Sequence, residues 1–284
     1  MLKYRLISGF SFMGLVGAMA LWAPSWVIGV FILLLCALAL LETVNLLTAA
    51  GMPALKWTAL GVGLLWMGSV WAAADDPAWR MLHWAMPAIT AWAVMLGCLF
   101  RSDQSQSLQK LTGTFFSVAY VPGLMQFLLL LLMLGDGVRH GDGRMLLFYG
   151  ILVIKFTDIG AYFTGRAIGK HKLIPRISPA KTWEGVIGGV LTSTGVSLLC
   201  LLIFGGTISG MSFRWWDGVA LGVLLGVSGI LGDLVESMLK RSADIKDSGS
   251  WIKGMGGLLD VLDSLLFAFP VLYVYVKWMM ERGV

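Results

Sequence analysis

The sequence predicts an all-α fold, a polytopic bundle of transmembrane helices, from its composition and the spacing of its apolar runs. Of the 284 residues, 58% are hydrophobic and 13% are charged, and the mean hydropathy is +0.82. A soluble domain has roughly 25% charged residues, so this chain needs lipid as its solvent. About 20 apolar residues span a bilayer. About nine spans are expected, at 6–22, 25–48, 55–74, 82–100, 111–134, 145–164, 183–206, 216–239 and 257–278.

Basic residues gather on one side of this nine-span pattern. With Lys155 set aside because it falls inside a span, 14 Lys and Arg residues lie on the side of the N-terminus and 6 on the other. Cytoplasmic loops carry the excess of Lys and Arg. The N-terminus and the loops 165–182 and 240–256 are therefore expected on the cytoplasmic side of a bacterial-type inner membrane. A cleaved signal peptide is the alternative for the first run.

The character of the chain changes in its second half. Residues 1–134 form about five spans with few polar groups, and we expect them to be an N-terminal scaffold. Glu42 is the exception, because an acid inside a span has either a functional role or a helix-bonding role. Residues 135–284 hold about four spans and both basic loops, with ionisable residues inside and beside the spans. We expect the chemistry to lie in this catalytic region.

Two helix faces in this region carry acidic and hydroxyl side chains at i, i+3 and i+4. The first face consists of Asp233, Glu236, Ser237 and Lys240, and the second of Asp260, Asp263 and Ser264. Two antiparallel helices joined by a short loop bring such faces together. Clustered acids need a cation, and hard oxygen ligands with room for water and phosphate suit Mg²⁺. An ion-paired helical hairpin is the alternative interpretation.

A glycine-rich turn precedes the second face. Gly254, Gly256 and Gly257 lie just before the predicted helix start. Free backbone N–H groups and the helix dipole at such a start favour bound phosphate. Together with the basic residues of the same loop, the turn predicts a site for phosphate chemistry.

The motifs of this region resemble the signature of the phosphatidate cytidylyltransferases (CDP-diacylglycerol synthases). The matching residues are Ser237-Met238-Leu239-Lys240-Arg241, Lys246-Asp247-Ser248-Gly249, Gly256-Gly257-Leu258-Leu259-Asp260 with Asp263, Lys3-Tyr4-Arg5-Leu6-Ile7-Ser8, Asp158-Ile159-Gly160-Ala161-Tyr162-Phe163 and Ser178-Pro179-Ala180-Lys181-Thr182-Trp183-Glu184-Gly185. The resemblance is strongest over 155–272.

The resemblance implies residue roles and an activity, the transfer of a cytidylyl group from CTP to phosphatidate with Mg²⁺ as cofactor. Asp233 and Asp260 are expected to hold the metal ions, and Lys240, Lys246 and Asp247 to act with them in catalysis. The implied substrate-binding residues are Asp158, Ser178, Lys181, Thr182, Glu184, Arg241, Lys253, Gly256, Gly257 and Asp263. The partners are then CTP, phosphatidate and the bilayer rather than nucleic acid, and homodimerisation is left open.

Other functions remain as alternatives. A CDP-archaeol synthase or a CTP-dependent polyprenol kinase would use similar residues on another lipid. An ion-coupled transporter also places acids within spans, but here the acids concentrate at one interface. A catalytically silent homologue is a further alternative, although every carboxylate of the signature is present.

The sequence departs from the family at three positions of the signature. Lys253, Met255 and Val261 stand where proline, histidine and arginine are usual in the family. Neither Met255 nor Val261 can donate a charge-assisted hydrogen bond to phosphate. One hypothesis is that Lys253 supplies the charge that the family takes from the missing arginine, so that Val261→Arg would recover part of the loss in a Lys253→Ala variant. The alternative is that Lys253 is a solvated loop residue.

The charge asymmetry predicts that single cysteines at Ser178 and Ser250 react from the cytoplasmic side only. In intact cells, a membrane-impermeant thiol reagent should leave both variants unlabelled until the membrane is permeabilised. Labelling of either cysteine from outside would contradict the predicted orientation.

Overall fold

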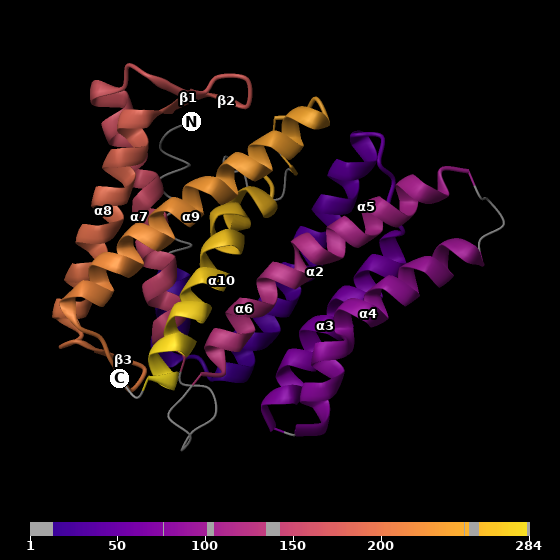
Figure 1. Cartoon of the computed structure of the whole chain (residues 1–284), viewed down its shortest axis with the longest axis horizontal. Coiled ribbons are helices and arrows are strands. Elements are labelled where there is room, and N and C mark those ends of the chain that lie inside the picture. Colours follow the sequence, from indigo (N-terminus) through magenta and orange to yellow (C-terminus); the bar gives the residue numbers. More distant parts are fainter. Residues whose placement is uncertain are drawn as a thin grey trace. The chain divides into compact units, whose positions relative to one another are not determined.

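The computed structural model of the chain describes residues 14–75, 77–100, 105–134, 143–246, 248–249 and 256–282. Helices dominate this part of the chain (Figure 1). After a helical stretch at 14–22, the elements are α2 (Ser25–Ala49), α3 (Lys56–Asp75), α4 (Pro77–Leu99), α5 (Ser107–Tyr120), α6 (Pro122–Leu132), α7 (Arg144–Ile168), β1 (Lys172–Ile174), β2 (Ser178–Thr182), α8 (Trp183–Ile203), β3 (Thr207–Ile208), β4 (Met211–Ser212), α9 (Trp215–Ser242) and α10 (Leu259–Glu281).

The predicted fold class is confirmed, and the predicted count of nine spans is not. Among the described residues, seven helical stretches are long and apolar enough to cross a membrane. The first expected span lies partly outside the described residues. The run expected at 55–74 forms α3, but α3 is not one of the seven.

The fifth expected span, 111–134, consists of two helices rather than one. The break falls at Val121 and Pro122, where α5 ends and α6 begins. Proline lacks a backbone N–H and disfavours a helical conformation in the residue before it. Pro122 therefore occupies the first turn of α6, where a missing N–H costs nothing.

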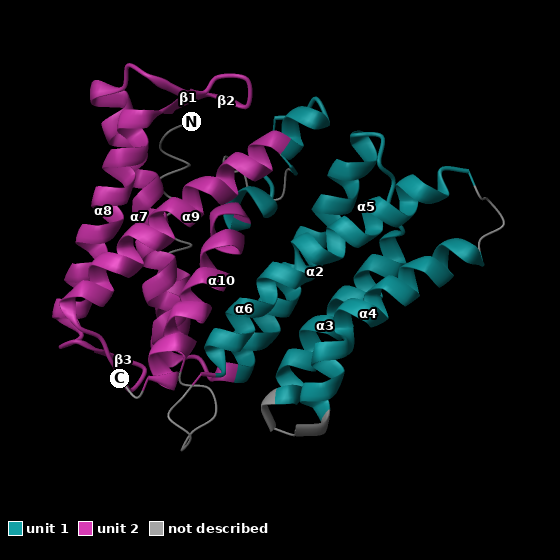
Figure 2. Cartoon of the chain, viewed as in Figure 1, with its two compact units in different colours: residues 1–9, 26–133, 239–262 teal, residues 10–25, 134–238, 263–284 magenta. Residues whose placement is uncertain are grey.

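The chain divides into two compact units, shown in different colours in Figure 2. Unit 1 consists of residues 1–9, 26–133 and 239–262, and unit 2 of residues 10–25, 134–238 and 263–284. The boundaries cut through α9 and α10, so each of these helices contributes to both units. The division into a scaffold up to 134 and a catalytic region beyond it stays a prediction.

In unit 1, α3 packs against α4, α5 and α6. The side chain of Trp66 on α3 donates to the amide oxygen of Gln126 on α6 at 3.0 Å. Near the start of α3, the backbone N–H of Leu55 donates to the hydroxyl of Thr114 on α5 at 2.7 Å. These bonds satisfy polar groups that lipid could not.

In unit 2, α7 and α8 lie side by side, and the β1–β2 hairpin joins their ends (Figure 1). The strands are antiparallel, with Lys172 opposite Thr182. The hydroxyl of Thr182 then accepts the backbone N–H of Gly185 at 3.2 Å and so caps the start of α8. This cap fixes the strand directly to the helix that follows it.

Helices α8 and α9 pack closely through small residues. Ser193 and Ser197 on α8 donate to the carbonyl oxygens of Gly222 and Gly218 on α9, at 2.9 and 2.6 Å. A Cβ atom on Gly222 would lie less than 3.0 Å from the backbone of Thr194. Small residues and interhelical hydrogen bonds are the usual means of helix association in lipid.

We predict that Gly222→Ala destabilises the protein by about 1–3 kcal/mol, because the added methyl group forces two backbones apart. Gly195→Ala on α8 is the matched control, since a Cβ atom there meets nothing within 4 Å. The control should be neutral or slightly stabilising, because alanine favours a helix over glycine. Thermal unfolding of both variants in detergent checks this. Equal midpoints would contradict the close approach of α8 and α9.

Candidate active site

Asp233 on α9 forms an ion pair with a lysine from the β1–β2 hairpin. Its carboxylate Oδ2 lies 2.7 Å from Nζ of Lys181 on β2. Its Oδ1 accepts a hydrogen bond from the hydroxyl of Ser237, one turn further along α9, at 3.3 Å. The hairpin therefore supplies the positive charge that this carboxylate needs near the end of an apolar helix.

Two further acids of unit 2 lie within electrostatic range of Asp233. They are Asp158 on α7 and Asp263 on α10. Lys155, one turn before Asp158, lies 3.8 Å from its carboxylate and donates to the hydroxyl of Ser264 at 3.4 Å. Three acids thus share two lysines in this unit.

A glycine allows α9 and α10 to bring these acids together. A Cβ atom on Gly232 would lie less than 3.0 Å from the backbone carbonyl oxygen of Asp263. Since Asp233 follows Gly232 directly, the close approach places the acidic turns of the two helices side by side. Any larger side chain at 232 would separate them.

A pocket of about 350 Å³ is lined by two of these acids, Asp158 and Asp233, and by Lys181, and we call it the Asp233 pocket. Residues from α7, the hairpin, α8 and α9 line it. They are Asp158, Ala161, Tyr162, Gly165, Arg166, Ala180, Lys181, Thr182, Gly185, Val186, Ile230 and Asp233. Four of the lining residues, Asp158, Lys181, Thr182 and Asp233, are predicted site residues, so the structure brings these together within unit 2.

Asp260, at the start of α10, belongs to a separate network in unit 1. Its carboxylate forms an ion pair with Lys240 of α9. It also accepts the backbone N–H and the hydroxyl of Ser248 at 3.1 and 2.8 Å, and the backbone N–H of Gly257 at 2.7 Å. These contacts hold the described part of the 240–256 loop against the helix start.

Glu42 on α2, which is far from α10 in the sequence, caps the start of α10. It is 3% exposed, and it accepts the backbone N–H groups of Leu258 and Leu259 at 2.9 and 2.7 Å. The hydroxyl of Ser248 also lies 3.3 Å from its carboxylate. Ser248 therefore links Glu42 to Asp260, and Glu42 bonds the backbone of α10. We call Glu42, Ser248, Asp260 and Lys240 the Asp260 network.

The prediction that the glycine turn offers free N–H groups to phosphate does not match this geometry. The N–H groups of Gly257, Leu258 and Leu259 all donate to carboxylates. Glycine is needed here for another reason. A Cβ atom on Gly257 would lie less than 3.0 Å from the carboxylate of Glu42 and the hydroxyl of Ser248.

The remaining predicted residues are placed elsewhere or lie outside the description. Ser178 pairs with Ile174 in the hairpin, and Gly256 has a φ of 92°, a left-handed conformation that favours glycine. Lys246 and Arg241 are exposed. Asp247 and Lys253 lie outside the described residues. Glu184 does not line the Asp233 pocket, because its carboxylate pairs with Nδ1 of His171 at 2.6 Å.

The structure argues against the expectation that an arginine at position 261 would contact phosphate in place of Lys253. Val261 is 3% exposed, so an arginine introduced there would be buried with it. A buried guanidinium without a partner costs several kcal/mol. Val261→Arg is therefore not expected to restore a phosphate contact, and Met255 lies outside the described residues.

Sequence analysis missed the roles of Tyr162, Arg166 and Ser248. Asp158, Tyr162 and Arg166 follow one another at four-residue steps on α7 and all line the Asp233 pocket. That spacing was a usable signal, since residues four apart share a helix face. Ser248 gave no signal beyond its place in the motif.

The carboxylates differ in how well they fit Mg²⁺. Among the described residues, no three His, Cys, Asp or Glu side chains come close enough together to hold a metal ion. Mg²⁺ is usually bound by one or two carboxylates with waters and phosphates, and the one-third exposed Asp233 fits that pattern. The roughly four lone-pair sites of Asp260 already accept from Lys240, Ser248 and Gly257. Asp260 fits the metal only if Lys240 moves away.

The apolar helices and the carboxylate–lysine clusters define an integral membrane protein with charged sites near helix ends. A family model described as the cytidylyltransferase family matches residues 3–279. The chain belongs to this family.

Several curated relatives of this chain are named phosphatidate cytidylyltransferase. A phosphatidate cytidylyltransferase of Staphylococcus epidermidis is 32% identical over 245 residues, 86% of each chain. Those of Staphylococcus haemolyticus and Bacillus subtilis are 41% identical over 159 residues and 44% identical over 138 residues. These two matches cover 56% and 48% of this chain and 56% and 49% of the relatives. The chain thus spans about half the length of several curated relatives that it matches.

We predict that Glu42→Gln destabilises the protein by about 1–3 kcal/mol. The amide keeps one acceptor oxygen but turns an N–H group toward a backbone donor, which leaves a buried group unsatisfied. Glu281→Gln, at the exposed end of α10, is the matched control and should change little. Chemical denaturation in detergent measures both. A Glu42→Gln variant as stable as the control would exclude the capping role.

Proposed function

We propose that this protein transfers a cytidylyl group from CTP to phosphatidate, giving CDP-diacylglycerol and pyrophosphate. The observation that carries the proposal is the family match over 3–279, together with a relative named phosphatidate cytidylyltransferase that aligns over 86% of both chains. The two carboxylate–lysine clusters support it, because they hold six residues of the matching motifs: Asp158, Lys181 and Asp263 in unit 2, and Lys240, Ser248 and Asp260 in unit 1.

The reaction asks mainly for positioning and charge neutralisation. A lipid phosphate oxygen attacks the α-phosphorus of CTP, the bond to the pyrophosphate oxygen breaks, and no protein nucleophile is needed. Two polyanions must be held in line, so fixed positive groups supply most of the rate enhancement. Lys181, Lys155 and Arg166 in unit 2 and Lys240 in unit 1 are the described groups that we assign to this task.

The carboxylates keep these lysines charged and oriented. The 2.7 Å pair of Lys181 with Asp233 fixes one ammonium group beside the Asp233 pocket. Lys240 is fixed in the same way by Asp260. These pairs would hold the two ammonium groups beside the site until Mg²⁺ took the place of the lysine at the carboxylate.

We further propose that Asp233 and Asp260 are ligands of catalytic Mg²⁺. When bound, Mg²⁺ would supply positive charge that offsets the charge of the leaving pyrophosphate. Asp233 is the better ligand because its carboxylate is one-third exposed, whereas that of Asp260 already accepts from Lys240, Ser248 and Gly257. Asp158 and Asp263 lie within electrostatic range of Asp233 in the same unit, so a cation bound there would also reduce the repulsion among the three acids.

We propose that the site lies on the cytoplasmic side of a bacterial inner membrane. The excess of basic residues on that side supports this orientation, and CTP is a cytosolic nucleotide. Phosphatidate presents its headgroup at the same interface. A homodimer is compatible with this proposal and is not required by it.

The test is the formation of CDP-lipid by the purified protein in detergent with phosphatidate, Mg²⁺ and CTP labelled in the cytosine. Cytidylyl transfer carries the label into the lipid, whereas a kinase reaction leaves it in the nucleotide. Lipid that gains phosphate but no cytosine label would overturn the proposal in favour of a CTP-dependent kinase.

We predict that Asp233→Asn and Asp260→Asn each nearly abolish turnover, because each removes a charge that binds the metal. Glu42→Gln should reduce kcat less, since Glu42 acts on the backbone of α10. Asp217→Asn, near the other end of α9, is a control whose kcat should remain close to that of the wild type. Steady-state kinetics on folded variants checks this. An aspartate variant that kept more than about a tenth of kcat, a loss under roughly 1.4 kcal/mol, would exclude direct metal ligation.

A further inference from the structure

The first turn of α8 presents two faces to two different hollows of unit 2. Thr182, Gly185 and Val186 line the Asp233 pocket. Trp183, Glu184 and Ile187 line an open hollow of about 700 Å³ together with Lys170, His171 and Lys172. We call this second hollow the Lys172 groove. Its residues are absent from the lining of the Asp233 pocket.

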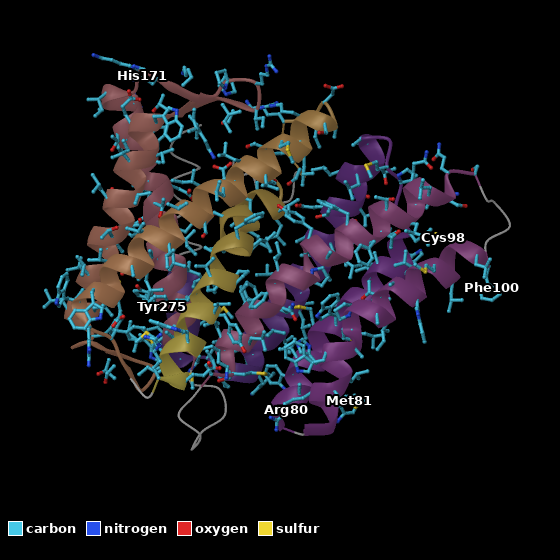
Figure 3. All side chains as sticks on the ribbon, viewed as in Figure 1. Arg80, Met81, Cys98, Phe100, His171 and Tyr275 are labelled. Carbon is cyan, nitrogen blue, oxygen red and sulfur yellow. The ribbon has the colours of Figure 1, made fainter. Side chains whose placement is uncertain are left out.

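The basic wall of the groove is held in place by backbone contacts. The N–H of Trp183 donates to the carbonyl oxygen of His171 at 2.9 Å. The N–H of His171 donates to the carboxylate of Glu184 at 3.2 Å, and its ring Nδ1 lies 2.6 Å from the same carboxylate. Figure 3 labels His171, which lies beside the hairpin. These bonds fix His171 between two exposed lysines.

The charge of the groove favours an anion. Lys170 and Lys172 are both exposed, and they flank His171 in the chain. The one carboxylate of the lining, that of Glu184, is engaged by the ring and the backbone of His171. The groove therefore presents two ammonium groups, while its negative charge is already bonded.

An apolar stripe leads away from the groove along α8. Trp183, Ile187 and Leu191 are 55%, 58% and 68% exposed, and their four-residue spacing puts them on one face of the helix. Helix α8 is one of the stretches that can cross a membrane. A nucleotide or a soluble anion would leave this stripe unused, whereas an acyl chain would cover it.

We propose that the Lys172 groove binds the headgroup of an anionic glycerophospholipid, with an acyl chain along Trp183, Ile187 and Leu191. Basic groups at the membrane boundary attract anionic headgroups, and the aromatic ring of Trp183 suits the interface. The groove is a binding site of its own, separate from the Asp233 pocket, and it does not depend on cytidylyl transfer. The ligand chemistry is a negatively charged headgroup phosphate on a diacylglycerol.

The test is equilibrium binding of radiolabelled lipids to the purified full-length protein in micelles of a neutral detergent. Phosphatidylglycerol, phosphatidate and phosphatidylcholine are compared on the wild type. The variant Lys170→Gln with Lys172→Gln is compared with Lys56→Gln with Lys277→Gln, which removes the same charge at other helix ends. Thermal unfolding in the same detergent shows that the variants are folded.

The anionic lipids should bind the wild type, and the Lys170/Lys172 variant should bind them on the order of tenfold more weakly. The Lys56/Lys277 variant should bind them as the wild type does. Equal binding of phosphatidylglycerol and phosphatidate supports a site for anionic lipids in general. Binding of phosphatidate alone supports the groove if the Lys170/Lys172 variant loses it, and it overturns the proposal if that variant keeps it, because phosphatidate is then bound only as the substrate.

Two further measurements separate the groove from other sites. Ile187→Asn should also weaken lipid binding, and Asp233→Asn should leave it unchanged. Glycerol phosphate, which lacks acyl chains, should compete poorly. The proposal is overturned if phosphatidylcholine binds equally well, if both double variants lose the same affinity, if glycerol phosphate competes as well as the lipid, or if Asp233→Asn abolishes binding.

Discussion

The pairing of carboxylates with lysines inside an apolar helical protein is the constraint on which the candidate site depends. An unpaired charge that is removed from water costs several kcal/mol. The partly buried carboxylates of Asp233 and Asp260 therefore each need a cation. Asp233 receives Lys181 and Asp260 receives Lys240. Lys181 comes from a polar hairpin, and Lys240 from the last turn of α9. The polar hairpin between α7 and α8 thus places the ammonium group of Lys181 beside the carboxylate of Asp233.

Close packing at glycine makes these pairings geometrically possible. Gly232 lets the backbone of α9 approach Asp263, and Gly257 leaves room for Glu42 and Ser248 beside the start of α10. In lipid, apolar side chains gain little by leaving the solvent, so the spacing of helices is set by small residues and hydrogen bonds. The same rule holds for α8 and α9, where serine hydroxyls bond glycine carbonyls. The glycines of the signature therefore position charged groups as well as the backbone.

Sequence reasoning predicted the helices, and it predicted pairings within one helix better than pairings between elements. Periodicity placed Asp233 and Ser237 on one face, and the structure bonds them to each other. The pairing of Lys181 with Asp233 and the cap that Glu42 makes on α10 join residues far apart in the chain, and periodicity carries no information on such contacts. The broken span at Pro122 was readable from the proline itself. Glu184 stays a predicted substrate-binding residue, and it lines a second hollow instead of the Asp233 pocket because adjacent residues of a helix turn face different sides.

The occupied start of α10 decides which groups remain for a polyanion. Glu42 and Asp260 accept the N–H groups of Gly257, Leu258 and Leu259, so the positive end of the helix dipole stabilises protein carboxylates. Among the described groups, lysine and arginine side chains then remain to receive phosphate. A lysine that pairs with a carboxylate is available to phosphate when another cation takes its place there. Under the proposed function, a metal ion at Asp233 would free Lys181 for phosphate, and a metal ion at Asp260 would free Lys240 in the same way.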